Sequence, residues 1–185
     1  MTLADGTYVM GPQSGRLVVK TGRTGLGSRA GHDLTIEVTR WHAEVVVNTG
    51  EPERSSVDVE VEVESMEVRE GSGGVKPLTD SDRADIKRNI REKVLDTAKH
   101  PTIGFHSSRI DATPDSVTVT GDLTITGTTR PVSVRGTVDD GGRVQAGATV
   151  QQSRWGIKPY SAFFGALKLA DDVSVELDAT LEPAG

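Results

Sequence analysis

The chain has 185 residues, a formal net charge of −6 and no cysteine. This length predicts a single domain, residues 1–185, that can bury a sizeable core. Charges of mixed sign argue against binding along nucleic-acid phosphates. The lack of cysteine excludes disulfides, thiolate catalysis and Cys-ligated metal sites.

The N-terminal segment does not have the pattern of an export signal. Residues 1–12 lack both the basic region and the apolar region that a secretory signal requires. No run of about 18 apolar residues occurs in the chain, so we expect no transmembrane helix. The expected location is therefore the cytoplasm.

A period of two dominates the rest of the chain. Between residues 57 and 64 every odd position is valine and every even position is acidic. A strand with one dry face and one wet face explains this alternation. Further strands, rich in β-branched residues, are expected at residues 7–10, 16–21, 34–38, 41–47, 102–110, 117–126, 132–135, 144–151 and 173–178.

Short segments of turn composition separate these strands. Residues 48–50, 113–115 and 139–142 have the composition of hairpin connections, so neighbouring strands should be mostly antiparallel. Gly121 and Gly136 fall inside strand patterns and predict bulges or bends. We expect residues 70–74 to form a flexible loop.

Residues 79–99 break the period of two and predict a helix. The apolar residues at helical spacing are Ile86, Ile90, Val94 and Leu95. Thr79 can cap the helix, with Asp82 in the role of a capping-box partner, and Pro101 stops it. We expect a helix over about residues 80–98 that lies across the sheet as a cover with its apolar face down. A homodimer in which that face meets a second subunit stays open.

One helix among roughly eight to ten strands predicts an all-β barrel or sandwich. The inward residues are mostly valine, and aromatic residues make up only 4% of the chain. An eight-stranded barrel is just wide enough to be filled by side chains or to hold one small ligand. Medium aliphatic side chains would leave a long, dry space in it. The patterns favour neither the barrel nor a sandwich of closely packed sheets.

Four segments, in order, resemble the YceI-like polyisoprenoid-binding family. They are residues 94–107, the hairpin Gly-Asp-Leu-Thr-Ile-Thr-Gly-Thr-Thr-Arg-Pro-Val at 121–132, and residues 153–157 and 171–175. The resemblance implies an antiparallel up-and-down, lipocalin-like β-barrel of about eight strands with one inserted α-helix, whose apolar pore takes an isoprenoid tail. Residues 16–20 and 25–34 depart from the family pattern. Many relatives carry an export signal, whereas residues 1–12 of this chain do not have that pattern. The comparison with the family therefore implies a cytoplasmic paralogue.

The candidate ligand contacts are the apolar residues on the inward faces of the predicted strands and the aromatic residues near residue 160, which would form a rim, a lid or core. Because their sequence neighbours are polar, we expect these strand residues to face inward: Val59, Val61, Val119, Leu123, Ile125, Val134, Val175 and Leu177. The candidate ligand-binding residues are Leu34, Ile36, Val38, Val59, Val61, Ile103, Phe105, Val119, Leu123, Ile125, Val134, Trp155, Ile157, Phe163, Phe164, Val175 and Leu177.

Other motifs predict no catalytic or metal site. The glycine-rich residues 25–31 precede a strand and not a helix, which argues against phosphate binding. His32 and Asp33 are adjacent in a strand and should point to opposite faces. The acidic row at residues 58–64 offers no encircling oxygen cage for calcium. Arg130 and Arg154 could meet an anionic headgroup at the barrel mouth, but a structural hydrogen bond is the preferred interpretation.

The sequence therefore predicts a non-catalytic carrier of a long apolar amphiphile such as a polyisoprenoid or quinone. It lacks a nucleophile elbow, a His-rich metal motif and a redox cysteine pair, which argues against an enzyme. No cofactor is expected other than the bound lipid, and the expected partner is a hydrophobic small molecule. The alternatives are an enzyme acting on such a lipid and a structural barrel with a filled interior.

Overall fold

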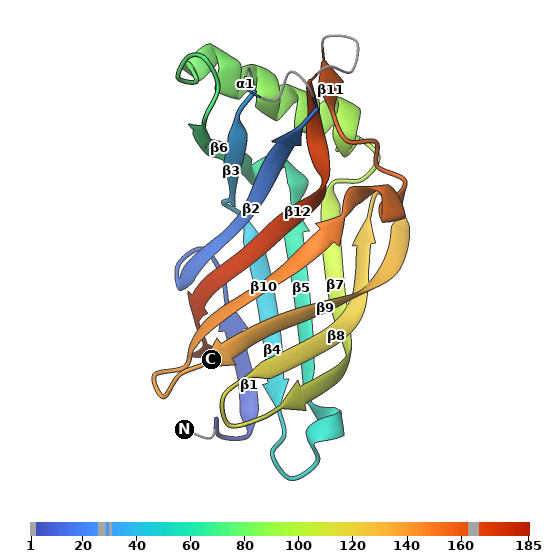
Figure 1. Cartoon of the computed structure of the whole chain (residues 1–185). Helices are drawn as coiled ribbons and strands as arrows, with labels where there is room; N and C mark the ends of the chain where they lie inside the picture. Colours follow the sequence, from blue (N-terminus) through green and yellow to red (C-terminus); the bar gives the residue numbers. More distant parts are fainter. Residues whose placement is uncertain (1–2, 26–28, 30, 163–166) are drawn as a thin grey trace.

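The structure is a computed structural model that describes residues 3–25, 29, 31–162 and 167–185. In these residues, one antiparallel sheet of thirteen strands curls around the interior, with a single short α-helix across one end (Figure 1). The all-β antiparallel prediction is confirmed. The strands are β1 (Gly6–Met10), β2 (Gly15–Thr24), β3 (Asp33–Val38), β4 (Trp41–Val47), β5 (Ser56–Glu62), β6 (Met66–Ser72), β7 (Thr102–Ala112), β8 (Val117–Ile125), β9 (Thr128–Val138), β10 (Arg143–Gln151), β11 (Ser161–Ala162), β12 (Leu167–Thr180) and β13 (Glu182–Pro183).

The sheet curls into a barrel because four long strands bend. The hydrogen-bonded order begins β13-β1-β4-β5 and ends β12-β2-β3-β6. Each strand of the first group is joined through a bend to one strand of the second group: β12 to β13, β1 to β2, β3 to β4 and β5 to β6. Main-chain hydrogen bonds cross these bends, from Thr180 N–H to the Ser14 carbonyl (2.9 Å) and from Thr39 N–H to the Ser65 carbonyl (3.1 Å). The strand count therefore exceeds the predicted number of about eight, because each bend divides one long strand into two segments.

Close approach of the backbone at one bend requires glycine. Gly15 pairs with Ala179, and a Cβ atom at Gly15 would lie 2.3 Å from the Ala179 Cα atom. No other residue fits there without shifting the backbone. This bend carries the first long strand from β1 into β2 and so places both halves on the barrel wall.

The hairpins form where turn composition predicts them, whereas the region after β5 differs from expectation. Residues 63–65 leave the strand as a 3-10 turn (Val63–Ser65), and β6 follows. Residues 70–72 are therefore part of a strand that pairs with β3, and the prediction of a loop over 70–74 is wrong for them. The expected bulge at Gly121 lies instead on the opposing strand β7, between Ser107 and Arg109.

The helix α1 (Asp80–Asn89) begins as predicted and ends early. Thr79 accepts a hydrogen bond from Asp82 N–H (3.1 Å), and the Asp82 carboxylate accepts one from Thr79 N–H (2.8 Å), which completes the capping box. A π-helical turn (Ile90–Val94) follows, and the left-handed backbone of Asp96 (φ 45°) stops the helix there. The predicted helical residues 95–98 lie outside the helix, and a turn spans residues 97–99.

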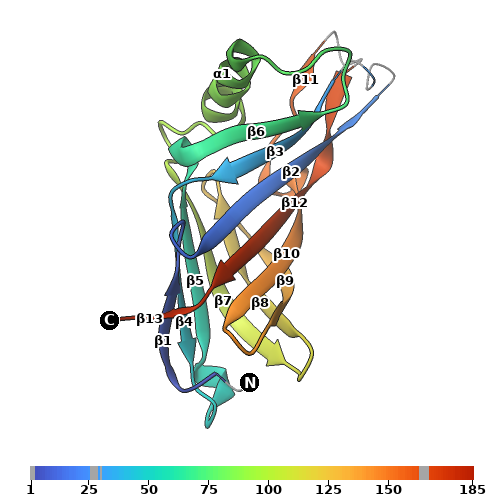
Figure 2. The same ribbon diagram turned by 90° about the vertical axis from the view of Figure 1, so that its left-hand side faces the viewer.

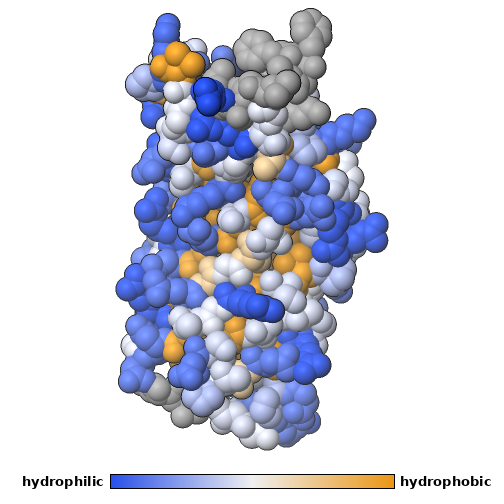
Figure 3. All heavy atoms as spheres, in the orientation of Figure 1, coloured by the Kyte–Doolittle hydropathy of each residue, from blue (hydrophilic) through white to orange (hydrophobic). Residues whose placement is uncertain are grey.

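The helix covers the end of the barrel and not a face of the sheet (Figures 1 and 2). Its residues Ile86, Ile90 and Val94 do face inward as predicted, into the barrel and not towards a second subunit. Polar side chains cover most of the outer surface in view in Figure 3, as expected for strands with one wet face. In the described part of the chain, no helix has the length and apolar character needed to cross a membrane.

Candidate functional site

A large cavity of about 1250 Å³ occupies the interior of the barrel. Sites for drug-sized molecules have volumes of about 300–1,000 Å³, so this space can hold a larger ligand. Its wall extends from the connection between β4 and β5, at one end of the barrel, to the helical segment at the other end (Figure 1). The cavity argues against a structural barrel with a filled interior.

The alternating pattern of the strands makes the cavity wall apolar. In β5, Val57, Val59 and Val61 line the cavity, whereas Asp58 and Glu60 point outward. Val59 pairs with Phe105, and Val61 with Ile103, on the neighbouring strand β7. Residues such as Val59 are only half-buried, because their side chains face open space and not other core atoms.

Small residues on β10 keep the middle of the barrel open. Ala146 lies opposite Leu177, and Ala148 lies opposite Val175, and all four side chains line the cavity. An alanine side chain is small, so it leaves the space in front of β10 empty. The half-burial of Ala148 agrees with a void in front of it.

The helical segment closes one end of the cavity. Ile86, Ile90 and Val94 supply the apolar ceiling. Beside these residues, an ion pair joins Arg91 Nε to Glu64 Oε2 (2.6 Å), and a second joins Lys87 to Glu67. These pairs fasten the helix to β6 and to the turn before it. Because the pairs are partly exposed, each contributes only about 0–1 kcal/mol.

Titratable side chains lie only near the two ends of the described cavity wall. They are His32 and Tyr160 at the helix end and Asp111 at the other end. His32 Nε2 lies 2.7 Å from the Lys76 carbonyl oxygen, and the Asp111 carboxylate accepts two hydrogen bonds from Arg109 (2.8 and 2.9 Å). The long middle of the cavity is walled by aliphatic and aromatic side chains.

The structure places most of the predicted ligand-binding residues on the cavity wall. These are Leu34, Ile36, Val38, Val59, Val61, Ile103, Phe105, Val119, Leu123, Ile125, Val134, Ile157, Val175 and Leu177. The expected inward residues are all found on the wall: Val59, Val61, Val119, Leu123, Ile125, Val134, Val175 and Leu177. Contact of these residues with a ligand stays a prediction. Phe163 and Phe164 lie outside the described residues.

Trp155 packs in the core and does not line the cavity. Its prediction as a residue of the cavity wall is therefore wrong. Its side chain is 2% exposed, and its indole N–H donates to the Leu123 carbonyl (2.9 Å). The Arg154 guanidinium lies over the indole ring, 5.5 Å from its centroid. Arg130 Nε donates to the Arg154 carbonyl (3.2 Å), which is the structural hydrogen bond that the sequence analysis favours for Arg130.

Outside the cavity, the His106 imidazole is paired with the Asp58 carboxylate. A hydrogen bond from the imidazole to the Asp58 carboxylate raises the pKa of His106 above its ordinary value of 6.5. Both side chains are exposed on the outer wall, so they cannot act on a ligand inside. His32 and Asp33 form no dyad, because Asp33 accepts from Arg23 N–H (3.0 Å). Among the described residues, no cluster of His, Asp and Glu could hold a metal ion.

Sequence reasoning missed the small and polar members of the wall. Ala146 and Ala148 lie in the predicted strand 144–151 with polar neighbours, so the period of two could have identified them. Asn48 and Thr49 at the open end lie in a hairpin turn, and their position on the wall depends on how the sheet curls. Local pattern carries no signal for that.

These observations define an antiparallel β-barrel protein with a large, largely apolar interior and a helical cover. A model of the YceI-like domain matches residues 14–181, so the chain belongs to the YceI-like family. A curated relative, a UPF0312 protein of Pseudomonas aeruginosa (strain LESB58), is 33% identical over 89 residues, which are 43% of this chain and 47% of the relative. The matched stretch thus spans about half the length of that relative.

Solved structures show the same fold. The crystal structure of BcnA from Burkholderia cenocepacia has a TM-score of 0.61 and 19% identity, covering 89% of this chain and 94% of BcnA. A YceI protein of Campylobacter jejuni has a TM-score of 0.50 and 12% identity, covering 77% of this chain and 81% of that protein. At these identities the similarity establishes the fold alone.

Proposed function

We propose that this protein binds one long, apolar amphiphile inside the barrel and carries it without a catalytic step of its own. The observation that carries this proposal is the cavity of about 1250 Å³ with an aliphatic wall. Such a wall binds through hydrophobic burial and dispersion, which are not directional. A polyisoprenoid or a quinone is the first ligand to test, because of the family resemblance.

The distribution of polar groups supports a carrier and not an enzyme. A catalyst needs a titratable or nucleophilic group beside the reacting atoms, usually with a second group that orients it. In the described wall of the cavity, His32, Asp111 and Tyr160 lie near the ends, and His32 and Asp111 each have structural partners. The middle of the cavity offers a bound chain no such group.

The test is a series of ligands with one headgroup and tails of increasing length. Burial of each methylene contributes about 0.8 kcal/mol, so affinity should rise about fourfold per methylene until the cavity is full, and then level off. Trp41 lines the cavity and can report binding by fluorescence, with Trp155→Phe as the background that leaves one indole. Affinity independent of tail length would refute the carrier proposal.

A further inference from the structure

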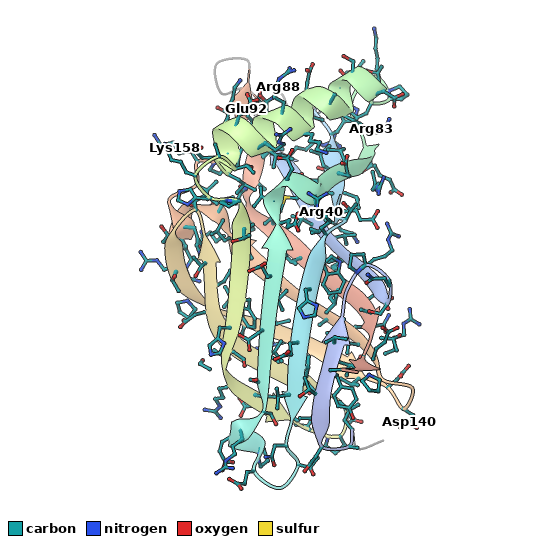
Figure 4. The ribbon with its side chains drawn as sticks, turned by 180° about the vertical axis from the view of Figure 1, so that it is seen from behind. Arg40, Arg83, Arg88, Glu92, Asp140 and Lys158 are labelled. Carbon is teal, nitrogen blue, oxygen red and sulfur yellow. The ribbon has the colours of Figure 1, made fainter. Side chains whose placement is uncertain are left out.

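A second, polar pocket of about 340 Å³ lies beside the end of the helical segment. Three separate stretches of chain form it: the π-helical turn and the residues after it, the β8–β9 hairpin, and the residues after Trp155. Figure 4 shows Lys158 next to the C-terminal end of the helix, away from Asp140 at the other end of the barrel. Lys93, His100 and Lys158 supply basic side chains to the pocket.

The pocket has an excess of positive charge. Lys93 and Lys158 are exposed, and neither forms an ion pair with any residue of the described chain. The one carboxylate of the pocket, Asp96, is paired with Lys99 (3.1 Å between Nζ and Oδ2). Two unpaired ammonium groups that line one concave site favour an anion there.

A strained residue forms part of the same pocket. Thr126 (φ 48°) and Gly127 (φ 74°) are the two central residues of the hairpin turn between β8 and β9. This turn requires positive φ at both positions, and a β-branched threonine is poorly suited to it. Thr126 lines the pocket, and its hydroxyl has no hydrogen-bond partner among the described residues. Strain of this kind persists where a site needs a particular side chain.

Two apolar side chains separate this pocket from the large cavity. Val94 and Ile157 line both spaces. Val94 is the last residue of the π-helical turn and is half-buried, whereas Ile157 is 7% exposed. A chain that passes between these two side chains would leave a polar end in the small pocket and a tail in the large cavity.

We infer that the small pocket binds the anionic headgroup, of phosphate or carboxylate chemistry, of an amphiphile whose tail occupies the large cavity. This inference rests on the proposed function, and it adds an orientation and a headgroup class to it. Lys93 and Lys158 donate charge-assisted hydrogen bonds to the anion, and the Thr126 hydroxyl donates a neutral one. A free phosphate ion offers the same chemistry, so the experiment separates the two sources.

The experiment compares hexadecyl phosphate, hexadecanol and inorganic phosphate as ligands of the full chain, by calorimetry at submicellar concentrations. The test variant is Lys93→Gln/Lys158→Gln. The control variant is Lys20→Gln/Arg135→Gln, which removes the same charge from exposed positions that line neither pocket. All four residues are exposed, so both variants should fold.

The wild-type protein and the control should bind hexadecyl phosphate about tenfold more tightly than hexadecanol, and this ratio should disappear in the test variant and shrink at high salt. Equal binding of the two amphiphiles by the wild type would overturn the inference but leave the proposed function intact. Inorganic phosphate binding as tightly as hexadecyl phosphate would show a site for a free anion and overturn it too. Failure of both amphiphiles to bind would refute the proposed function itself.

Discussion

Filling the cavity at mid-height should shorten the tails that the protein can bind. Ala148 faces the cavity from β10, opposite Val175, and is half-buried because no side chain occupies the space before it. In Ala148→Phe the new ring enters this space and blocks the cavity beyond it. The strand continues four residues from Ala148 back to Val144, which is about 13 Å of wall at about 3.3 Å per residue.

The expected loss of affinity follows from the methylenes excluded. The excluded length can hold more than four methylenes, and at about 0.8 kcal/mol each the exclusion of four alone costs about 3 kcal/mol, so the affinity for a long tail should fall by at least about 200-fold. Short tails that stop before the plug should bind as they do to the wild type. Stability should stay equal or rise, because the ring fills an existing void and does not displace packed atoms.

The assay is the tail-length series measured by calorimetry, with urea unfolding on the same samples. Thr149→Phe is the matched control, because Thr149 is the next residue on β10 and is exposed on the outer surface. An unchanged affinity for long tails in Ala148→Phe would refute the reasoning. A loss of stability of about 1–3 kcal/mol would refute it as well, because a loss of that size indicates that the ring overpacks the site and does not fill a void.

Three further predictions concern the wall, a turn and an ion pair. Val61→Asp should destabilise the protein by about 3 kcal/mol or more in urea unfolding, because Val61 is 8% exposed and faces the apolar cavity. Thr126→Asn should increase the free energy of unfolding by about 1 kcal/mol, measured as a higher urea midpoint at unchanged m-value, because asparagine tolerates positive φ. The His106 contribution to stability should be fully present below about pH 6.5 and lost as the pH rises through its raised pKa, and Asp58→Asn should lower that pKa in an NMR titration.

Each of these predictions has an outcome that contradicts it. A neutral effect of Val61→Asp, equal to that of Glu60→Gln on the outer face, would mean that water fills the cavity. A loss of stability in Thr126→Asn would show that the threonine side chain stabilises the turn. An unchanged His106 titration in Asp58→Asn would show that the hydrogen bond does not form in solution.

The period of two was sufficient to predict the strands and their inward faces. The alternation at residues 57–62 specifies which side of β5 lies inside, and the hairpin turns give the antiparallel order. The bends could not be predicted in this way. Val63 continues the valine pattern but leaves the strand, because burial of its side chain (1% exposed) at the corner outweighs strand pairing. The position of each bend depends on contacts between residues that are distant in sequence.

The candidate site was only partly predictable for the same reason. Its apolar wall follows from local alternation, whereas its volume depends on how far the curled sheet holds opposing strands apart. The position of Trp155 could not be predicted from its residue type, because an aromatic residue in a turn can belong to the cavity rim or to the core. In the structure it belongs to the core. The small pocket joins Lys93, Thr126 and Lys158 from three distant segments, and no local pattern brings them together.

Native mass spectrometry of the protein purified from the cells that express it naturally is the most direct test of whether the barrel carries one lipid. We expect a bound species in one-to-one stoichiometry whose added mass, after extraction, is that of a single long-chain lipid. Ala148→Phe should shift the bound population to shorter chains. A protein that is recovered only in its unliganded mass, and that takes up no long-chain lipid when one is added, would contradict the account.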